Sequence, residues 1–502
     1  MREDQAVGAP ERLHPLFLLT GLGASLRGTA GGYAVIAYLL FSGRAATALI
    51  GVVALVALLV VSTFIYWRRF EFRVGADEIR IDSGIFSRTH RSIPFDRIQD
   101  VDIAQGPLAR ILGLAQVKFE TGGSAGADEG VLAAIPLERA EQLRLQVRSR
   151  RLASTETETS SSESDRPPVY AMDLKQLALA GTFNFSLALF AGLFGLTQTM
   201  GDVLGFDPFT RRFWLSVLSA GDPIADFLLA HRVATAIAGA LLLMLIGLAT
   251  GIVRTVIRDF GFRLDRAEGG LRRRRGLLTR TDVTLPVKRA QAALILTGPV
   301  RDGFGWRELK LQSLARDEGG SGDHLLAPLA GDAEIASIIS EIGWRWPPGS
   351  ARWAGVSPFY VWTLAIALSP LLLIAMAQAA VAGLVPPGPG EGSAPLLVPA
   401  LLFLAVVGAI AARWLAWRRT AYALDGERLL IRTGWWRRRL LLLPLDRLQS
   451  IDIKESLVSR WFGIATVAFG VAGGSGYSAH IIPAVPRETA RKLRDDLLIR
   501  TL

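Results

Sequence analysis

Arginine forms the densest clusters of charged side chains in this sequence, and these clusters are the first candidates for a functional site. Four consecutive Arg residues occupy 272–275, Arg280 follows, and three more occupy 437–439. Basic clusters beside a membrane attract anionic headgroups, and each basic residue near the surface contributes about 1 kcal/mol. The candidate anionic-lipid contacts are Arg272, Arg273, Arg274, Arg275, Arg280, Arg437, Arg438 and Arg439.

A second interpretation of these clusters stays open. Both lie in stretches expected to form strands, where successive residues point to opposite faces, so only about half of residues 272–275 can share one surface. Positive charge on an edge strand also discourages aggregation. The clusters therefore indicate either lipid contact or an edge strand protected by its charge.

A set of six residues recurs three times with the same internal spacing. The second copy lies 192 residues after the first, and the third lies 158 residues after the second. The set could be a shared ligand contact, but a structural role is the simpler interpretation: Pro fixes the start of a strand while Arg and Gln bond to the backbone at a barrel corner. The residues are Gly84, Arg88, Pro94, Arg97, Gln99 and Gly113, then Gly276, Arg280, Pro286, Arg289, Gln291 and Gly305, then Gly434, Arg438, Pro444, Arg447, Gln449 and Gly463.

The rest of the sequence offers little for catalysis or cofactor binding. The absence of Cys excludes disulfides, thiol nucleophiles and Cys-based metal sites. The five His residues are scattered without the spacing of a helical metal site, and no nucleophile elbow, zinc-protease motif or phosphate-binding loop occurs. We therefore expect no enzymatic activity, no cofactor, no metal and no small-molecule substrate.

Composition points to a membrane protein. Half of the residues are apolar, 20% are charged, the mean hydropathy is +0.34 and the net charge is +11. A basic chain can also bind nucleic acid, but here the Arg excess lies largely at the ends of apolar runs. We therefore expect membrane lipids as partners and no nucleic acid.

Six apolar runs are candidate membrane spans, since about 20 apolar residues cross the hydrocarbon core. They form three pairs, and seven Arg residues lie at the ends of the pairs whereas three lie in the connections within them. The positive-inside rule then predicts that both termini and the segments after each pair lie on the cytoplasmic side of the inner membrane. The six runs are 27–41, 45–67, 177–200, 233–253, 358–384 and 396–417.

The segment after each pair of spans is predicted to be mainly β. Alternating strands are joined by tight Gly turns, and each segment closes with a stretch that has apolar residues at helical spacing. About seven strands capped by a C-terminal helix describe a small β-barrel or an orthogonal sandwich, with the helix closing one end.

The stretch SGIFSRTHRSIPFDRIQDVDIAQGPLARILGLAQVKFET, residues 83–121, resembles the bacterial pleckstrin-homology (PH) domain membrane proteins of the YdbS/YdbT type. The resemblance covers almost the whole chain as three units, each a helical hairpin followed by a PH-like domain. It implies PH-like barrels at the inner membrane surface without enzymatic activity. Copy two departs from the pattern: we count two extra residues before Gly276 and expect a remodelled first hairpin and a specialised face.

The expected organisation is therefore six membrane spans and three PH-like domains. The segments are 1–69 (N-terminal segment and hairpin one), 70–151 (PH-like copy one), 152–170 (disordered linker), 171–258 (hairpin two), 259–345 (PH-like copy two), 346–419 (hairpin three) and 420–502 (PH-like copy three).

Two functions fit this organisation. The leading hypothesis is a cytoplasmic-membrane scaffold for envelope maintenance or stress resistance, whose PH-like domains bind proteins, anionic lipid or each other. The alternative is an accessory or component of a membrane transporter or export system that acts through the six-helix bundle. The alternative would depend on Asn184 or Gln198, two polar residues within the spans, although helix packing explains both residues.

Overall fold

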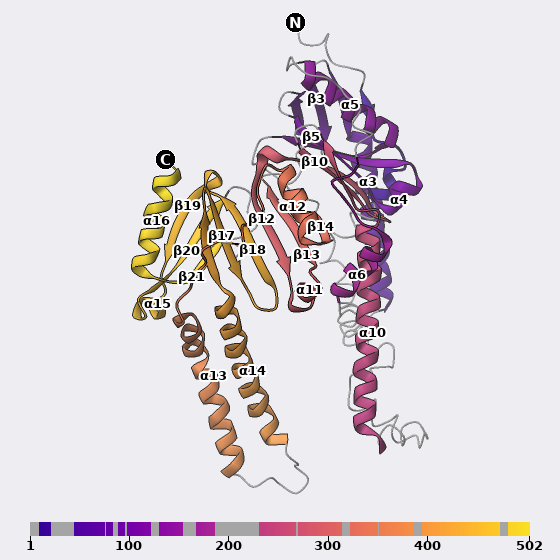
Figure 1. Cartoon of the computed structure of the whole chain (residues 1–502). Helices are drawn as coiled ribbons and strands as arrows, with labels where there is room; N and C mark the ends of the chain where they lie inside the picture. Colours follow the sequence, from indigo (N-terminus) through magenta and orange to yellow (C-terminus); the bar gives the residue numbers. More distant parts are fainter. Residues whose placement is uncertain are drawn as a thin grey trace. The chain divides into compact units, whose positions relative to one another are not determined.

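The computed structural model divides the chain into two compact units, an N-terminal unit of residues 1–267 with 271–284 and a C-terminal unit of residues 268–270 with 285–502 (Figure 1). The structure describes residues 10–21, 45–75, 77–83, 89–95, 98–121, 130–153, 167–185, 230–267, 270–313, 322–349, 351–384, 394–471 and 480–501.

The N-terminal unit contains two antiparallel sheets. The first has the strand order β1-β2-β3-β4 and belongs to copy one. Its strands are β1 (Glu11–Arg12), β2 (Glu71–Val74), β3 (Glu78–Ser83) and β4 (Thr89–Pro94).

The second sheet of this unit combines two copies. In its order β7-β6-β5-β11-β10-β9-β8, three strands come from copy one, three from copy two, and β8 precedes copy two. The strands are β5 (Ile98–Gln105), β6 (Leu114–Thr121), β7 (Val131–Pro136), β8 (Tyr170–Ala171), β9 (Arg263–Ala267), β10 (Gly270–Arg275) and β11 (Arg280–Pro286). The copies are thus joined edge to edge through β5 and β11.

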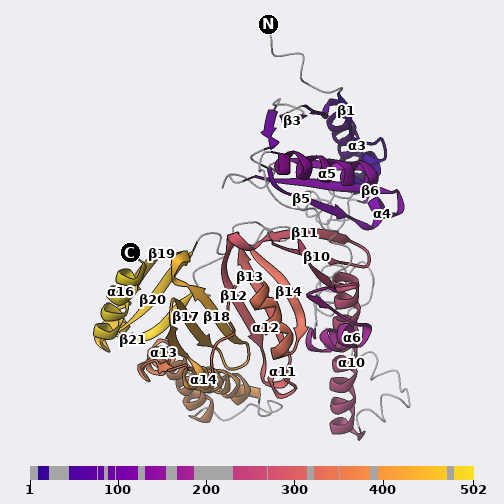
Figure 2. The same ribbon diagram turned by 45° about the horizontal axis from the view of Figure 1, so that its top comes forward.

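One hydrophobic core connects the two sheets of copy one with helix α5 (Leu137–Ala153). Ala140, Leu143 and Val147 lie three and four residues apart, so they share one face of α5 and are buried in this core. Phe72 comes to the same core from the first sheet and Val117 from the second. Figure 2 shows α5 lying over the strands of copy one.

The C-terminal unit repeats this arrangement. Its larger sheet, β14-β13-β12-β18-β17-β16-β15, joins copies two and three through β12 and β18, and β19-β20-β21 forms a separate sheet. The strands are β12 (Ala290–Thr297), β13 (Arg307–Ser313), β14 (Asp323–Ala330), β15 (Ala354–Gly355), β16 (Ala421–Asp425), β17 (Arg428–Thr433), β18 (Arg438–Pro444), β19 (Leu448–Lys454), β20 (Ile464–Val471) and β21 (Ile481–Pro486).

Helices cover the sheets at matching positions. Helix α16 (Arg487–Thr501) buries Ala490, Leu493 and Leu497 in the core of copy three, at the spacing seen in α5. Copy two uses the shorter α12 (Asp332–Glu341), which buries Ile335, Ile338 and Ile339. Short connector helices occupy matching positions in the three copies: α4 (Pro107–Ile111) links β5 to β6, α11 (Pro299–Gly303) links β12 to β13, and α15 (Leu457–Trp461) links β19 to β20.

Four of the described helices are long and apolar enough to cross a membrane. Little of their surface is covered by protein, so their exposed Leu, Val and Ile side chains require an apolar surrounding. The four are α3 (Ala45–Arg69), α10 (Arg232–Asp259), α13 (Phe359–Leu384) and α14 (Ala394–Arg419), and the last two run side by side as a hairpin (Figure 1). The predicted span at 27–41 and the part of 177–200 beyond Phe185 lie outside the described residues.

Helix α6 (Leu174–Phe183) packs closely against α10 through small residues. A Cβ on Gly181 would come within 2.5 Å of the backbone of Ile252, so only Gly permits this approach. Asn184, at the end of α6, donates its side-chain amide to the hydroxyl of Thr255 at 3.0 Å. The expectation that helix packing explains Asn184 is confirmed; Gln198 lies outside the described residues.

The repeat offsets inferred from sequence are also those of the structural elements. Strand β12 begins and ends 192 residues after β5, and β17 lies 158 residues after β10. The expected two-residue insertion in copy two is wrong, because β10 begins and ends 192 residues after β3 and leaves no room for extra residues. Most of the predicted linker at 152–170 lies outside the described residues, but its two ends do not: α5 runs to Ala153, and β8 begins at Tyr170.

Candidate functional site

The hairpin of β10 and β11 packs against the end of membrane helix α10. The backbone N–H of Gly276 donates to the carbonyl of Phe260 at 2.8 Å, and that of Leu277 donates to the carbonyl of Ile257 at 3.0 Å. Carbonyls in the last turn of a helix lack partners within the helix, so the hairpin tip satisfies them. The Arg-rich strand is therefore held where α10 would leave the membrane.

Glycine makes this tip possible. Gly276 has φ = +110°, and a Cβ there would lie 1.8 Å from the carbonyl oxygen of Thr279. Gly434, its counterpart in copy three, has φ = +82°. The interpretation of these repeated glycines as structural residues at hairpin turns fits the observed backbone.

Most of the predicted lipid-binding arginines of copy two are engaged within the protein. Arg272 pairs with Asp282 and Arg274 with Asp265, while Arg275 lies 3.2 Å from Asp259. Arg273 is fully buried. The edge-strand interpretation is wrong, because β10 lies between β9 and β11 in the sheet.

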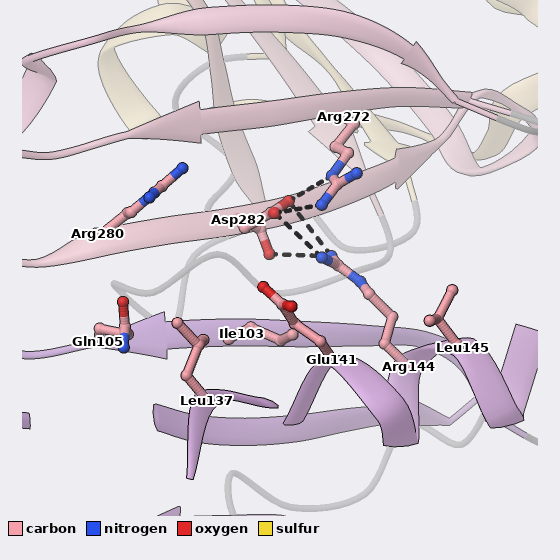
Figure 3. A pocket seen from close by; sticks show the side chains of 9 residues that line it. All are labelled: Ile103, Gln105, Leu137, Glu141, Arg144, Leu145, Arg272, Arg280 and Asp282. Atoms are coloured by element: carbon pink, nitrogen blue, oxygen red, sulfur yellow. Dashed lines mark hydrogen bonds and ion pairs between the residues drawn. The ribbon is translucent and has the colours of Figure 1, made fainter. Parts of the chain in front are cut away.

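A junction pocket of about 270 Å³ lies where α5 of copy one meets β11 of copy two (Figure 3). Asp282 receives Arg272 Nε at 2.8 Å from one side and Arg144 Nη1 at 3.1 Å from the other. Burial alone would raise the pKa of Asp282, but the Arg272 hydrogen bond and the positive charges of Arg144 and Arg272 outweigh burial and lower that pKa. Asp282 is therefore a carboxylate whose ion pair with Arg144 connects α5 of copy one to β11 of copy two.

A second cavity, the basic pocket, has a volume of about 360 Å³ and opens beside the end of α10. Five arginines contribute to its lining, together with the backbone region of Phe260 and Gly276. The arginines are Arg110, Arg263, Arg274, Arg275 and Arg280.

The five arginines of the basic pocket outnumber the carboxylates beside them, and two of the five differ from the rest. Arg263 and Arg274 share the carboxylate of Asp265, and Arg275 lies beside that of Asp259. For Arg110 and Arg280, the part of the chain that the structure describes shows no carboxylate partner, and Arg110 donates only to the carbonyl of Leu277. Two guanidinium groups beside a membrane helix form a site suited to a phosphate group.

The arginines of copy three are divided in the same way. Arg438 pairs with Asp302 of copy two across the β12–β18 junction, whereas Arg437 is exposed and Arg439 is half-buried. Trp436, in the turn between β17 and β18, is also exposed. Trp and Arg side chains are both suited to contact with a membrane surface, and this turn exposes one of each.

The rest of the repeated motif lies at the strand junctions. Pro286 and Pro444 each precede a single-turn 3-10 helix, η3 (Val287–Arg289) and η4 (Leu445–Arg447). Gln291 is buried and donates to the carbonyl of Arg289 at 3.2 Å, as a structural role requires, whereas Gln449 is exposed. Gly113, Gly305 and Gly463 all have positive φ after the connector helices. Gly84, Arg88 and Arg97 lie outside the described residues, as does the side chain of Gln99.

Sequence reasoning missed Arg110, Arg144 and Asp282. Arg110 and Arg144 are far from the Arg cluster along the chain, and only folding brings them to it. Asp282 carried a usable signal, because an acidic residue on the strand facing an Arg-rich strand can form a cross-strand ion pair. No group of three His, Asp or Glu side chains among the described residues is arranged to hold a metal ion.

Comparison with known proteins identifies the repeated unit. The bacterial PH domain family matches residues 18–151, 219–342 and 361–501, which together form most of the chain. The chain belongs to the bacterial PH domain family. Each of the three family matches includes one of the copies described above.

Two transmembrane proteins of Bacillus subtilis are relatives of this bacterial PH domain protein. UPF0699 transmembrane protein YdbT is 26% identical over 322 residues, 61% of this chain and 62% of YdbT. UPF0699 transmembrane protein YdbS is 38% identical over 78 residues, 16% of this chain and 45% of YdbS. The chain thus spans less than two thirds of either relative. No solved structure matches it.

Proposed function

We propose that this protein is a membrane scaffold whose PH-like copies bind anionic lipid headgroups and a protein partner. The observation that carries the proposal is the basic pocket beside the end of α10, where Arg110 and Arg280 have no carboxylate partner among the described residues. Headgroup phosphates lie at the depth where a membrane helix ends, so the pocket is at the level of its ligand.

The connections between helices and sheets support a scaffold held at the membrane surface. Strand β2 begins at Glu71, two residues after α3 ends, and β16 begins at Ala421, two residues after α14 ends. Such short connections leave copies one and three little freedom to move away from the bilayer.

Exposed apolar residues on the connector helices also support membrane contact. Ile111 on α4 and Trp461 on α15 are 81% and 82% exposed. The ring of Phe462, directly after α15, stacks on that of Phe359 at the start of membrane helix α13, with 4.7 Å between centroids. A connector helix at this position can insert its apolar side chains among the lipids.

The proposal extends to architecture and location. It includes six membrane spans, a PH-like barrel closed by its helix in each copy, the cytoplasmic membrane as the location, and both termini with the PH-like copies on the cytoplasmic side. It assigns no enzymatic activity, and it places the role in envelope maintenance or stress resistance. The transporter alternative lacks a specific observation in its favour, since the Asn184 amide is used in helix packing.

The double variant Arg110→Gln with Arg280→Gln tests the lipid site. The full-length protein in micelles of a neutral detergent is titrated with short-chain phosphatidylglycerol, and the rise in Tm gives the apparent affinity. At about 1 kcal/mol for each basic residue, the variant should bind roughly 10- to 30-fold more weakly than wild type.

Arg494→Gln is the control, because Arg494 is a partly exposed arginine on α16 that pairs with Asp495 at 2.8 Å and is not among the residues that line the basic pocket. Short-chain phosphatidylcholine, which has the phosphate but no net charge, should raise the Tm of wild type less than phosphatidylglycerol does. Equal phosphatidylglycerol affinity for wild type and the double variant would refute a lipid site in the basic pocket.

A further inference from the structure

The two junctions between copies share one strand register. At the first junction, Arg280 lies opposite Gln105 and Asp282 opposite Ile103. At the second, Arg438 lies opposite Thr297 and Leu440 opposite Ile295. Applying the repeat offsets of 192 and 158 residues places both pairs at the same positions of the PH-like unit. The fold therefore has one reusable edge contact, in which β11 or β18 of one copy pairs with β5 or β12 of the copy before it.

Two edges of this type are left over at the ends of the repeat. Within the described residues, β4 of copy one pairs only with β3, and β19 of copy three pairs only with β20. β4 is the counterpart of β11 and β18, whereas β19 is the counterpart of β5 and β12. The backbone groups along the outer side of an edge strand are a template for another strand.

Burial along β5, β12 and β19 shows the effect of the missing neighbour of β19. Ile103, Ile295 and Ile453 occupy the same position in the three copies. Ile103 and Ile295, whose strands are paired on both sides, are 7% and 2% exposed, whereas Ile453 is only half-buried. Six residues of β12 are buried, but none of β19 is. Copy three thus keeps an apolar residue at a position that is covered in the other two copies.

We propose that β19 of one chain pairs antiparallel with β4 of a second copy of this chain. The shared register then places Thr89 opposite Lys454, His90 opposite Ile453, Arg91 opposite Asp452 and Ser92 opposite Ile451. Arg91 and Asp452 have opposite charge, and such cross-strand pairs stabilise a sheet. This inference rests on the proposed scaffold function and identifies its protein partner.

The contact differs from that of a symmetric dimer. Because β4 and β19 are different surfaces, each chain keeps one unused edge after the first contact, and further chains can add until a ring closes or a filament grows. Added chains bring their own membrane helices, since these precede the sheets of each copy. Strand addition of this kind forms main-chain hydrogen bonds along the whole edge.

The natural absence of Cys permits a direct cross-linking test. Two full-length chains with different affinity tags are co-expressed, one carrying His90→Cys and the other Ile453→Cys, and membranes are treated with a mild oxidant. Residues directly opposite in antiparallel strands lie within disulfide range. We expect a dimer that carries both tags, and no dimer when both chains carry His90→Cys.

A shift by one residue provides the control for register. Combining His90→Cys with Asp452→Cys places the two thiols on opposite faces of the joined sheet, so this pair should cross-link at least about tenfold less. A chain carrying both His90→Cys and Ile453→Cys tests whether β4 and β19 of the same chain pair with each other instead. If that chain forms mainly an intramolecular disulfide, or if the two-tag dimer is absent or independent of register, the contact with a second copy is refuted.

Charge reversal separates this contact from lipid binding. Asp452→Arg in the Ile453→Cys chain should lower the two-tag dimer several-fold, and Arg91→Asp in the His90→Cys chain should restore it. Both chains should keep wild-type affinity for short-chain phosphatidylglycerol, because neither residue lines the basic pocket. A dimer yield that responds to neither charge reversal would contradict the strand contact alone. Unchanged phosphatidylglycerol affinity of the Arg110→Gln, Arg280→Gln variant, with cross-linking still dependent on register, would contradict the lipid site alone.

Discussion

Replacing Asp282 by Ala should lower the free energy of unfolding of the N-terminal unit by roughly 2–4 kcal/mol. The substitution leaves the guanidinium groups of Arg144 and Arg272 facing each other without their shared carboxylate (Figure 3). The Asp282 side chain is only 17% exposed, so water screens the remaining charges poorly. Urea-induced unfolding of the full-length protein in detergent micelles measures the change.

Asp446→Ala is the matched control, since its carboxylate is 67% exposed and pairs with Arg447 at 3.2 Å. An exposed pair of this kind contributes little, and the control should stay within about 1 kcal/mol of wild type. A double-mutant cycle with Arg272→Ala should give a coupling energy of about 1 kcal/mol or more. Equal stability of the two Asp variants would show that the junction does not depend on Asp282.

The contribution of Asp282 should also depend on pH. Its pKa is lowered in the folded protein, so the unfolded chain binds its proton first as the pH falls. The stabilisation is complete above the ordinary Asp value of about 3.9 and is lost as the pH falls through the lower folded value. The difference in stability between wild type and Asp282→Asn should therefore be constant near neutral pH and shrink below about pH 4. A constant difference down to strongly acidic pH would contradict this account.

Gly276→Ala should be the most damaging single substitution at the hairpin of β10 and β11. The new Cβ would meet the carbonyl oxygen of Thr279 at 1.8 Å, and φ = +110° is a conformation that L side chains rarely adopt. Backbone strain alone costs about 1–3 kcal/mol, and the clash adds to it. We expect a loss of roughly 3 kcal/mol or more, measured by thermal unfolding, together with weaker phosphatidylglycerol binding because the tip lines the basic pocket.

Gly106→Ala is the control for this substitution. Gly106 precedes α4 in the same unit, has φ = −69°, and a Cβ there would meet no atom within 4 Å. Its stability should change by less than about 1 kcal/mol. If both Ala variants unfold at the same temperature, the positive φ of Gly276 is not what shapes the hairpin.

Much of the fold could be predicted because it is local. The alternation around Gly276 and Gly434 indicated hairpins, and the structure has positive φ at both residues. The helical spacing of Ala140, Leu143 and Val147 likewise indicated the buried face of α5. These features depend on neighbours only a few residues apart, so period and spacing are enough to determine them.

The site was harder to predict because its charges are distributed across the fold. The sequence pointed to Arg272, Arg274 and Arg275, but in the structure each has a carboxylate partner. The excess charge of the basic pocket instead includes Arg110, which is contributed by a connector helix of another copy. A cluster of Arg in sequence therefore did not predict which charges stay available to a ligand.

The sequence by itself determined the membrane character, the threefold repeat and the PH-like family, because hydropathy and repeat spacing can be seen without a fold. Only the tertiary structure decided which strands pair between copies. Every residue type except Pro offers the same backbone donor and acceptor, so the alternation in β5 or β11 specifies a buried face but not the neighbouring strand. The choice of β5 with β11 and of β12 with β18 depends on how whole units pack, and it also leaves β4 and β19 as the unpaired edges.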